Sequence, residues 1–309
     1  EMRKILVLIS AALVLVATAL SAALLGGGKA AAAGWGQASG AGLGGDYHMG
    51  QARINTLCLF QDDLYAGTSS EGFCDVWRLR DSRWSLVKEL GYVEGMDLEH
   101  PELLNRGITS MAAFGAHLYV GTMNMSGCEI WRYDGSSWNC VVGPGGEVGR
   151  GFGDAGNMIA SSMAVFGGRL YIGTVHDPGG LRLYRTSNGT TWERADGGAL
   201  GANNIAAVTL SVFGGYLYLG TENHATGCQV WRSSDGATWS LSAGGGFGDV
   251  HNRTAHAMSV FAGHLYVGTE NETSGLGLYR TSDGIAWSRV DGGTLGPNNT
   301  KAASMAVYG

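Results

Sequence analysis

Leu265-Tyr266-Val267-Gly268-Thr269 decides the fold, because the chain carries five copies of this pattern. The other copies begin at Leu64, Leu118, Leu170 and Leu217, so successive copies lie 54, 52, 47 and 48 residues apart. A near-constant period of this length is typical of solenoids, propellers and other repeat arrays. We therefore interpret the 309-residue chain as one repeat array rather than as several unrelated domains.

One regular copy of the repeat predicts four short strands. The apolar segment 162–166 and the segment 170–174 flank Gly167-Gly168, a pair that favours a tight hairpin turn. The alternating segment 181–185 predicts a third strand, and a fourth begins at Trp192. Four antiparallel strands in about fifty residues make one blade of a β-propeller.

The fold expected over residues 51–309 is therefore an all-β propeller with five complete four-stranded antiparallel blades. One more apolar strand, residues 303–308, follows the fifth blade. A six-bladed ring that includes these five blades is therefore an alternative. Glycine is abundant (53 residues), proline is scarce (4) and charged residues make up 15% of the chain. This composition is expected for short strands joined by tight turns.

A turn with Asp-Gly or Asn-Gly ahead of a tryptophan recurs between the third and fourth strands. Asp134, Asp235 and Asp283 lie in such turns, where the dipeptide supplies positive φ angles. The motif resembles the Asp-box of sialidases and related propellers, in which the box is a folding element away from the catalytic site. We predict that these aspartates are structural. An aromatic–arginine pair in every copy is interpreted as a contact between blades.

Propeller topology assigns the longer loops to one face. Alternate connections fall on opposite sides of a blade, so the loops 151–157 and 246–252 lie opposite the short glycine turns. Their Asn and Asp oxygens suit sugar hydroxyls or a calcium ion, although calcium has no specific motif here. The same residue types also cap turns, so a structural role stays open. The candidate binding residues are Asn124, Asp154, Asn157, Asn223, Asp249, Asn252 and Asn271.

The first 25 residues predict one hydrophobic α-helix. An uncharged run extends from Ile5 to Gly28, and about 21 helical residues reach roughly 30 Å, the thickness of a membrane's hydrocarbon core. Three roles of this helix are alternatives: the core of a filament, a membrane anchor, or a retained signal peptide. The layout resembles type IV pilins and related archaeal filament subunits, although Ile5 stands where the bacterial pattern has glutamate. Residues 26–50 are Gly/Ala-rich and are expected to form a linker.

Cysteines and glycosylation motifs fit an exported protein. None of the five cysteines has metal-ligand spacing, and no metal site is predicted. Cys128 and Cys140 lie within reach of each other across one hairpin, which makes them a candidate disulfide. The glycosylation candidates are Asn124, Asn188, Asn252, Asn271 and Asn298.

Charge and motifs argue against several functions. The net charge of −6 does not suit nucleic-acid binding, which needs a basic face. The chain has no HExxH, GxSxG or P-loop motif, so we expect no enzymatic activity and no cofactor.

Residues from about Gly44 to Gly309 resemble a family of extracytoplasmic propeller repeats of bacteria and archaea. The motifs that carry this resemblance are Leu-Tyr-x-Gly-Thr-x-Asn, Gly-Cys-x-[Val/Ile]-Trp-Arg, Asp-Gly-x-x-Trp and Gly-Phe-Gly-Asp-x-x-Asn. The resemblance implies an extracellular or cell-surface location and names no ligand.

The expected function is a pilin-like filament subunit that displays the propeller for adhesion. Residues 1–25 would drive self-assembly and contact the membrane during export. A secreted lectin-like propeller that binds cell-surface or environmental glycans is the alternative, and a glycan-degrading enzyme is a weaker one.

Overall fold

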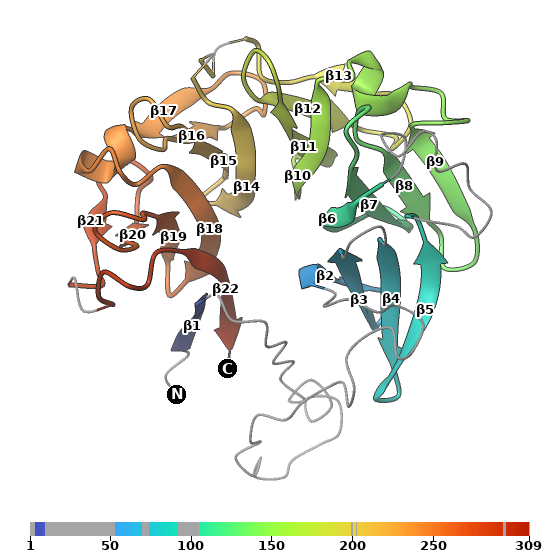
Figure 1. Ribbon diagram of the computed structural model, residues 1–309, viewed down its shortest axis with the longest axis horizontal. Helices are drawn as coiled ribbons and strands as arrows, with labels where there is room; N and C mark the ends of the chain where they lie inside the picture. Colours follow the sequence, from blue (N-terminus) through green and yellow to red (C-terminus); the bar gives the residue numbers. More distant parts are fainter. Residues whose placement is uncertain are drawn as a thin grey trace.

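The computed structural model describes residues 4–9, 53–69, 74–91, 105–198, 200–201, 203–292 and 295–308. Its strands form five antiparallel blades arranged in an arc (Figure 1). The first strands of neighbouring blades pack against one another along the inner side of the arc. The expected all-β, propeller-like fold with four-stranded blades is confirmed.

Each blade consists of four consecutive strands. They are β2 (Arg53–Phe60), β3 (Asp63–Ser69), β4 (Asp75–Arg80) and β5 (Arg83–Glu89) in blade 1; β6 (Gly107–Phe114), β7 (His117–Met123), β8 (Ile130–Tyr133) and β9 (Trp138–Val142) in blade 2; β10 (Asn157–Phe166), β11 (Arg169–His176), β12 (Arg182–Thr186) and β13 (Glu193–Arg194) in blade 3; β14 (Ala206–Phe213), β15 (Tyr216–Glu222), β16 (Val230–Ser233) and β17 (Ser240–Ala243) in blade 4; and β18 (Thr254–Phe261), β19 (His264–Glu270), β20 (Leu278–Thr281) and β21 (Ser288–Arg289) in blade 5.

The Gly-Gly turn predicted between the first two strands is present in blade 3. Phe166 at the end of β10 pairs with Arg169 at the start of β11. Gly167 and Gly168 adopt φ angles of 55° and 72° between them. Glycine enters this left-handed region without the steric cost that a Cβ would bring.

The glycine of the Leu-Tyr-x-Gly-Thr motif is required by the contact between blades. A Cβ added at Gly173 of β11 would lie 2.5 Å from the Cβ of Ala207 in blade 4. A Cβ added at Gly121 of β7 would lie 2.6 Å from the Cβ of Ala160 in blade 3. The repeated glycine therefore allows the sheet of one blade to approach the first strand of the next.

The tyrosine and the arginine of the repeat contact the turn of the following blade. The Tyr119 hydroxyl donates a hydrogen bond to the carbonyl oxygen of Gly189 at 3.4 Å. Arg185 Nη1 donates to the carbonyl oxygen of Gly236 at 3.2 Å, beside the Tyr171 hydroxyl. The interpretation of the aromatic–arginine pair as an interblade contact is confirmed for Arg185.

The Asp-box-like turns are held by their aspartates, as predicted. Asp134 Oδ1 accepts hydrogen bonds from the backbone N–H groups of Ser137 and Ser136, both at 2.7 Å. These bonds lower the pKa of Asp134 from its ordinary 3.8 to about 2. Asp235 and Asp283 each accept the same pair of backbone hydrogen bonds in their own turns.

Residues Lys4–Ile9 form strand β1, which corrects the expectation that they belong to a helix. The strand pairs antiparallel with β22 (Ala302–Tyr308), which follows blade 5. Without this partner, one edge of β22 would expose unpaired backbone groups, and the alternating β-branched residues of β1 favour a strand. The rest of the predicted helix over residues 1–25 and the linker over residues 26–50 lie outside the described residues.

The described blades do not close into a ring. β1 and β22 form a two-stranded sheet of their own at one end of the arc (Figure 1). Within the part of the chain that the structure describes, no helix has the length and apolarity needed to span a bilayer.

The candidate disulfide between Cys128 and Cys140 is not formed, and both residues are free thiols. In the ladder between β8 and β9, Cys140 lies opposite Trp131, so the backbone does not place the two cysteines face to face. Cys128 is buried in the apolar core that blades 2 and 3 share. Burial raises the pKa of each thiol to about 12.

Candidate functional site

The two Gly-Phe-Gly-Asp loops form equivalent structures ahead of blades 3 and 5. They contain the short helices η4 (Arg150–Gly153) and η5 (Gly245–Gly248). Phe152 and Phe247 both have a φ angle of 60°. Residues other than glycine seldom adopt this conformation, and it often marks a functional constraint. The two phenylalanines lie 95 residues apart (247 − 152), the length of two repeats.

Five of the predicted binding residues are buried amides that join the loops to the blades. Asn157 Nδ2 donates to the Gly151 carbonyl oxygen at 2.8 Å, and its Oδ1 accepts from the Thr174 hydroxyl at 2.8 Å. Asn252 makes the equivalent bonds in blade 5. A ligand could reach these amides only by breaking such bonds. The buried residues, all at most 2% exposed, are Asn124, Asn157, Asn223, Asn252 and Asn271.

Asp154 and Asp249 are the two predicted binding residues that reach solvent. Their side chains are 54% and 38% exposed. Asp154 accepts a hydrogen bond from the backbone N–H of Gly156 at 3.0 Å, and Asp249 accepts one from that of His251 at 2.9 Å. In each case this backbone bond is the main cause of a lowered pKa. Both carboxylates are therefore charged acceptors at neutral pH.

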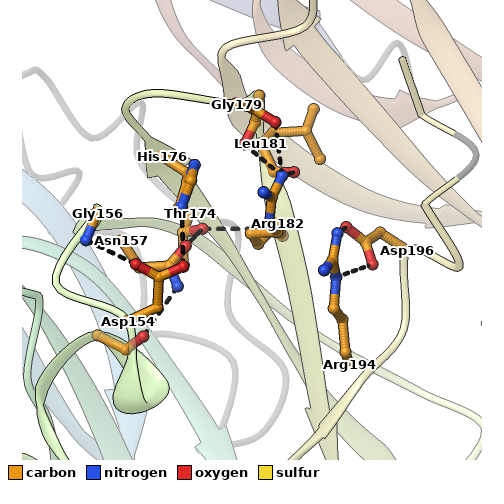
Figure 2. A network of polar contacts seen from close by, with 12 residues as sticks. Asp154, Gly156, Asn157, Thr174, His176, Gly179, Leu181, Arg182, Arg194 and Asp196 are labelled. Carbon is orange, nitrogen blue, oxygen red and sulfur yellow. Dashed lines mark hydrogen bonds and ion pairs between the residues drawn. The ribbon is translucent and has the colours of Figure 1, made fainter. Parts of the chain in front are cut away.

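The two carboxylates have different side-chain partners. Asp154 Oδ2 lies 3.0 Å from Nε2 of the buried His176, whose Nδ1 has no hydrogen-bond partner (Figure 2). Asp249 Oδ2 instead accepts hydrogen bonds from Asn271 Nδ2 at 3.1 Å and from the Ser274 hydroxyl at 3.0 Å. Asp249 Oδ1 also lies 3.1 Å from Nδ1 of the exposed His251. Each carboxylate thus has a histidine partner, which is buried in blade 3 and exposed in blade 5.

Phe247 forms an aromatic cluster on blade 5. Its ring stacks on Tyr279 with centroids 4.3 Å apart and planes inclined by 11°. It also meets Trp287 in a T-shaped arrangement with centroids 5.4 Å apart. Trp287 Nε1 donates to the Ser242 hydroxyl of blade 4 at 3.1 Å, which fixes the orientation of the indole. The cluster is a rigid aromatic wall at the junction of blades 4 and 5.

A pocket of about 540 Å³ opens beside this aromatic wall. It lies between the outer strand of blade 4 and the outer strands of blade 5. Ile285, which is 67% exposed, adds an apolar edge. The pocket therefore combines aromatic faces, one carboxylate and one guanidinium. Its lining residues are Ser242, Ala243, Gly244, Phe247, Gly248, Asp249, Tyr279, Ile285, Trp287 and Arg289.

Arg289 is held in place at the pocket by a buried carboxylate. Its Nε and Nη2 donate to the two oxygens of Asp291 at 2.7 and 2.9 Å. This pair raises the pKa of Arg289. Its Nη1 has no hydrogen-bond partner among the described residues, so one donor edge stays available on an exposed side chain.

Blade 3 carries the same set of side chains 95 residues earlier. Phe152 stacks on Tyr184 with centroids 3.9 Å apart and meets Trp192 at 5.4 Å. Arg194 donates to both oxygens of Asp196 at 2.6 and 2.9 Å. We define the blade-3 site as Phe152, Asp154, Tyr184, Trp192 and Arg194, and the blade-5 site as Phe247, Asp249, Tyr279, Trp287 and Arg289.

Sequence reasoning found only the aspartates of these two sites. Tyr184, Trp192 and their blade-5 counterparts were not predicted to bind, because they occupy positions that are aromatic in every blade. The two phenylalanines, Arg194 and Arg289 lie outside those recurring positions, and no binding role was predicted for them. The signal that could have found them is the 95-residue spacing, which joins Phe152 to Phe247 and Arg194 to Arg289.

The glycosylation candidates differ in exposure. Asn188 and Asn298 are exposed, whereas Asn124, Asn252 and Asn271 are buried. Among the described residues, no group of three or more His, Cys, Asp and Glu side chains could hold a metal ion.

Comparison with known proteins identifies the fold. No family model matches the chain, and no curated protein matches it. The BP39L lectin of Burkholderia pseudomallei is similar in structure, with a TM-score of 0.57, 14% identity, and coverage of 76% of this chain and 68% of the lectin. A putative 6-phosphogluconolactonase of Bacteroides fragilis has a TM-score of 0.53, 10% identity, and coverage of 83% and 73%.

The SapL1 lectin in complex with alpha methyl fucoside has a TM-score of 0.50, 12% identity, and coverage of 77% of this chain and 79% of the lectin. These identities are low, and the similar structures include proteins with unrelated names. The likeness therefore shows a β-propeller-like fold alone.

Proposed function

We propose that the protein is a lectin-like propeller that binds carbohydrate at the blade-5 site and at its blade-3 counterpart. The observation that carries the proposal is the blade-5 pocket, in which Trp287 and Phe247 stand beside Arg289 and Asp249. Sugars present apolar C–H faces next to hydroxyl groups that donate and accept hydrogen bonds. A concave aromatic wall with a few fixed polar groups matches both properties.

Rigidity supports the proposal. Arg289 is clamped by Asp291, and Trp287 is oriented by Ser242. Side chains that are held before a ligand arrives lose little conformational entropy on binding. Two of the similar solved structures are named as lectins, one of them in complex with alpha methyl fucoside, so sugar binding is compatible with this fold.

Export and the lack of catalysis are further parts of the proposal. The proposed location outside the cell rests on the uncharged run that begins at Ile5 and on the glycosylation motifs. Adhesion would be the biological use of sugar binding there. Self-assembly through residues 1–25 stays a prediction, because Lys4–Ile9 form a strand and the remaining residues of that segment are not described.

A glycan array tests the proposed function. The wild-type protein should bind a limited set of glycans, and Trp287→Ala should reduce the signal because it removes the aromatic wall of the blade-5 site. Trp138→Ala is the matched control, since Trp138 occupies the same motif position in blade 2 without a Gly-Phe-Gly-Asp loop ahead of it. Folded wild-type protein that binds no glycan, or equal loss in both variants, would contradict the proposal.

A further inference from the structure

The blade-3 and blade-5 sites share their aromatic residues but differ at one cationic position. Arg182 precedes Tyr184 by two residues, and 95 residues later the equivalent position is Gly277. A Cβ at Gly277 would lie 2.6 Å from the Tyr279 ring, so this position in blade 5 suits glycine. The two sites therefore share their aromatic residues and differ in the charge beside them.

The strand register places Arg182 next to Arg194. Residues two apart on a strand share a face, so Arg182 and Tyr184 project from the same side of β12. Tyr184 pairs directly with Arg194 of β13. Arg182 and Arg194 are thus diagonal neighbours on one face, a relationship with a separation of roughly 7–8 Å. Figure 2 shows the two side chains on these adjacent strands.

Arg182 is fixed and retains free donors. Its Nη1 donates to the carbonyl oxygens of Gly179 and Gly180 at 2.8 Å and of Leu181 at 3.1 Å. These bonds turn the guanidinium toward the loop and hold it there (Figure 2). Its Nε and Nη2 make no hydrogen bond among the described residues, so they can meet an oxyanion in the paired geometry that guanidinium groups favour.

The two sites differ in how many arginines balance the charge of their aspartates. In blade 3, Arg182 and Arg194 stand against Asp154 and Asp196, and His176 lies against Asp154. The formal charge of these four arginine and aspartate groups is zero.

In blade 5, Arg289 alone stands against Asp249 and Asp291, a formal charge of −1. Asp249 is also approached by His251 at 3.1 Å, and its other partners, Asn271 and Ser274, are neutral. The blade-3 site is thus one positive charge richer than the blade-5 site.

We propose that the blade-3 site selects sugars that carry an oxyanion, a carboxylate or a sulfate, and that Arg182 is the residue that determines this selectivity. The blade-5 site, which has Gly277 in place of Arg182, does not favour the anionic sugar of such a pair. This inference rests on the proposed carbohydrate binding. It makes the propeller a binder with two sites of different selectivity, rather than a binder with two identical sites.

Matched sugar pairs test the inference. The Trp287→Ala variant reports on the blade-3 site, and the Trp192→Ala variant reports on the blade-5 site. Each is titrated by ligand-observed NMR at low salt with methyl glucoside, methyl glucuronide and glucose 6-sulfate, and with the corresponding galactose series. Trp287→Ala should bind the anionic member of a pair about fivefold more tightly than the neutral one, as expected for one exposed charge contact. Trp192→Ala should show no such preference.

Substitutions at residue 182 separate charge from loop structure. Arg182→Gly, introduced with Trp287→Ala, should abolish the anion preference. Arg182→Lys keeps the charge and should retain most of the preference, although lysine lacks the fork that holds the loop. Added salt should reduce the preference in the arginine and lysine proteins because the contact is exposed.

Each outcome bears on a different claim. An anion preference that survives Arg182→Gly, or equal affinities within every pair in Trp287→Ala, would overturn the inference and leave carbohydrate binding intact. A preference lost equally in Arg182→Lys and Arg182→Gly would show that the loop acts rather than the charge, and would also overturn it. Failure of the folded wild-type protein to bind any of these sugars or any array glycan would overturn the proposed function as well.

Discussion

The contact between blades 3 and 4 and the pocket of blade 5 are both built from repeated residues, but they use them differently. At the contact, Tyr171 and Thr174 are buried and Gly173 abuts Ala207 of the next blade. At the pocket, Trp287 is only partly buried and Arg289 is exposed.

The difference lies in the period of repetition. Residues of the interblade contact recur in every blade, about 50 residues apart, because every pair of neighbouring blades needs them. The complete combination of Phe, Tyr, Trp and Arg recurs only after 95 residues, in blades 3 and 5. A residue set that skips alternate blades is not demanded by stacking, and this points to function.

The largest effect is expected for Gly173→Val, at the contact between blades 3 and 4. The new side chain would clash with Ala207, and the main chain of two packed blades cannot easily move apart. We expect the free energy of unfolding to fall by about 3 kcal/mol, measured by urea denaturation. Gly168→Ala is the control, because its Cβ meets nothing within 4 Å. Alanine at the positive φ angle of residue 168 should lower the free energy of unfolding by only about 1 kcal/mol. Equal losses would contradict the role given to Gly173.

A smaller loss is expected for Thr221→Val in the same motif of blade 4. The buried hydroxyl donates to Asn204 Oδ1 at 3.1 Å and accepts from the backbone N–H of Gln229 at 3.0 Å. Valine leaves both groups without this partner, at a cost of about 2 kcal/mol. Thr226→Val, on the exposed loop that follows, should change stability by less than about 0.5 kcal/mol. Urea denaturation of both variants measures the two changes in the free energy of unfolding, and equal changes would contradict the role given to the Thr221 hydroxyl.

As the pH falls, the Asp-box-like turns should be weakened at a higher pH than the stacked aromatic residues of the two sites. The folded-state pKa of Asp134 is about 2, below the ordinary value of 3.8. Its contribution to stability is therefore complete above pH 3.8 and is lost as pH falls toward 2. Asp134→Asn keeps an acceptor that does not titrate. The stability difference between wild type and this variant should shrink over that range, and a difference that stays constant would exclude the carboxylate as the cause.

The smallest effect on stability is expected at the pocket edge. Ile285→Ser should alter the free energy of unfolding by less than about 0.5 kcal/mol, because the side chain is largely exposed. It should nevertheless weaken binding of the glycans selected by the array. A large loss of stability would show that Ile285 has a structural role instead of a role in the pocket.

The repeat predicted the blades because its requirements are local or come from the adjacent blade. Gly167-Gly168 specifies a turn, and Gly173 specifies a close approach. The strand at Lys4–Ile9 could not be predicted in this way, since its partner β22 lies about 300 residues away in sequence. An isolated apolar segment satisfies helix and strand patterns equally until its neighbour is known.

The candidate site was only partly predictable for a similar reason. Asp154 and Asp249 were found from their oxygen chemistry and loop position. Asn157 has the same chemistry, but burial commits it to Gly151 and Thr174, and a single sequence does not reveal burial. Phe247 and Tyr279 come together only when a loop folds over the next blade.

The number of sugars bound per chain tests the central claim most directly. Isothermal titration calorimetry with a glycan that occupies both sites should give two bound molecules per wild-type chain. One should remain in Trp287→Ala or Trp192→Ala, and none in the double variant. A double variant that is folded by circular dichroism and still binds two molecules would place the site elsewhere and contradict the account.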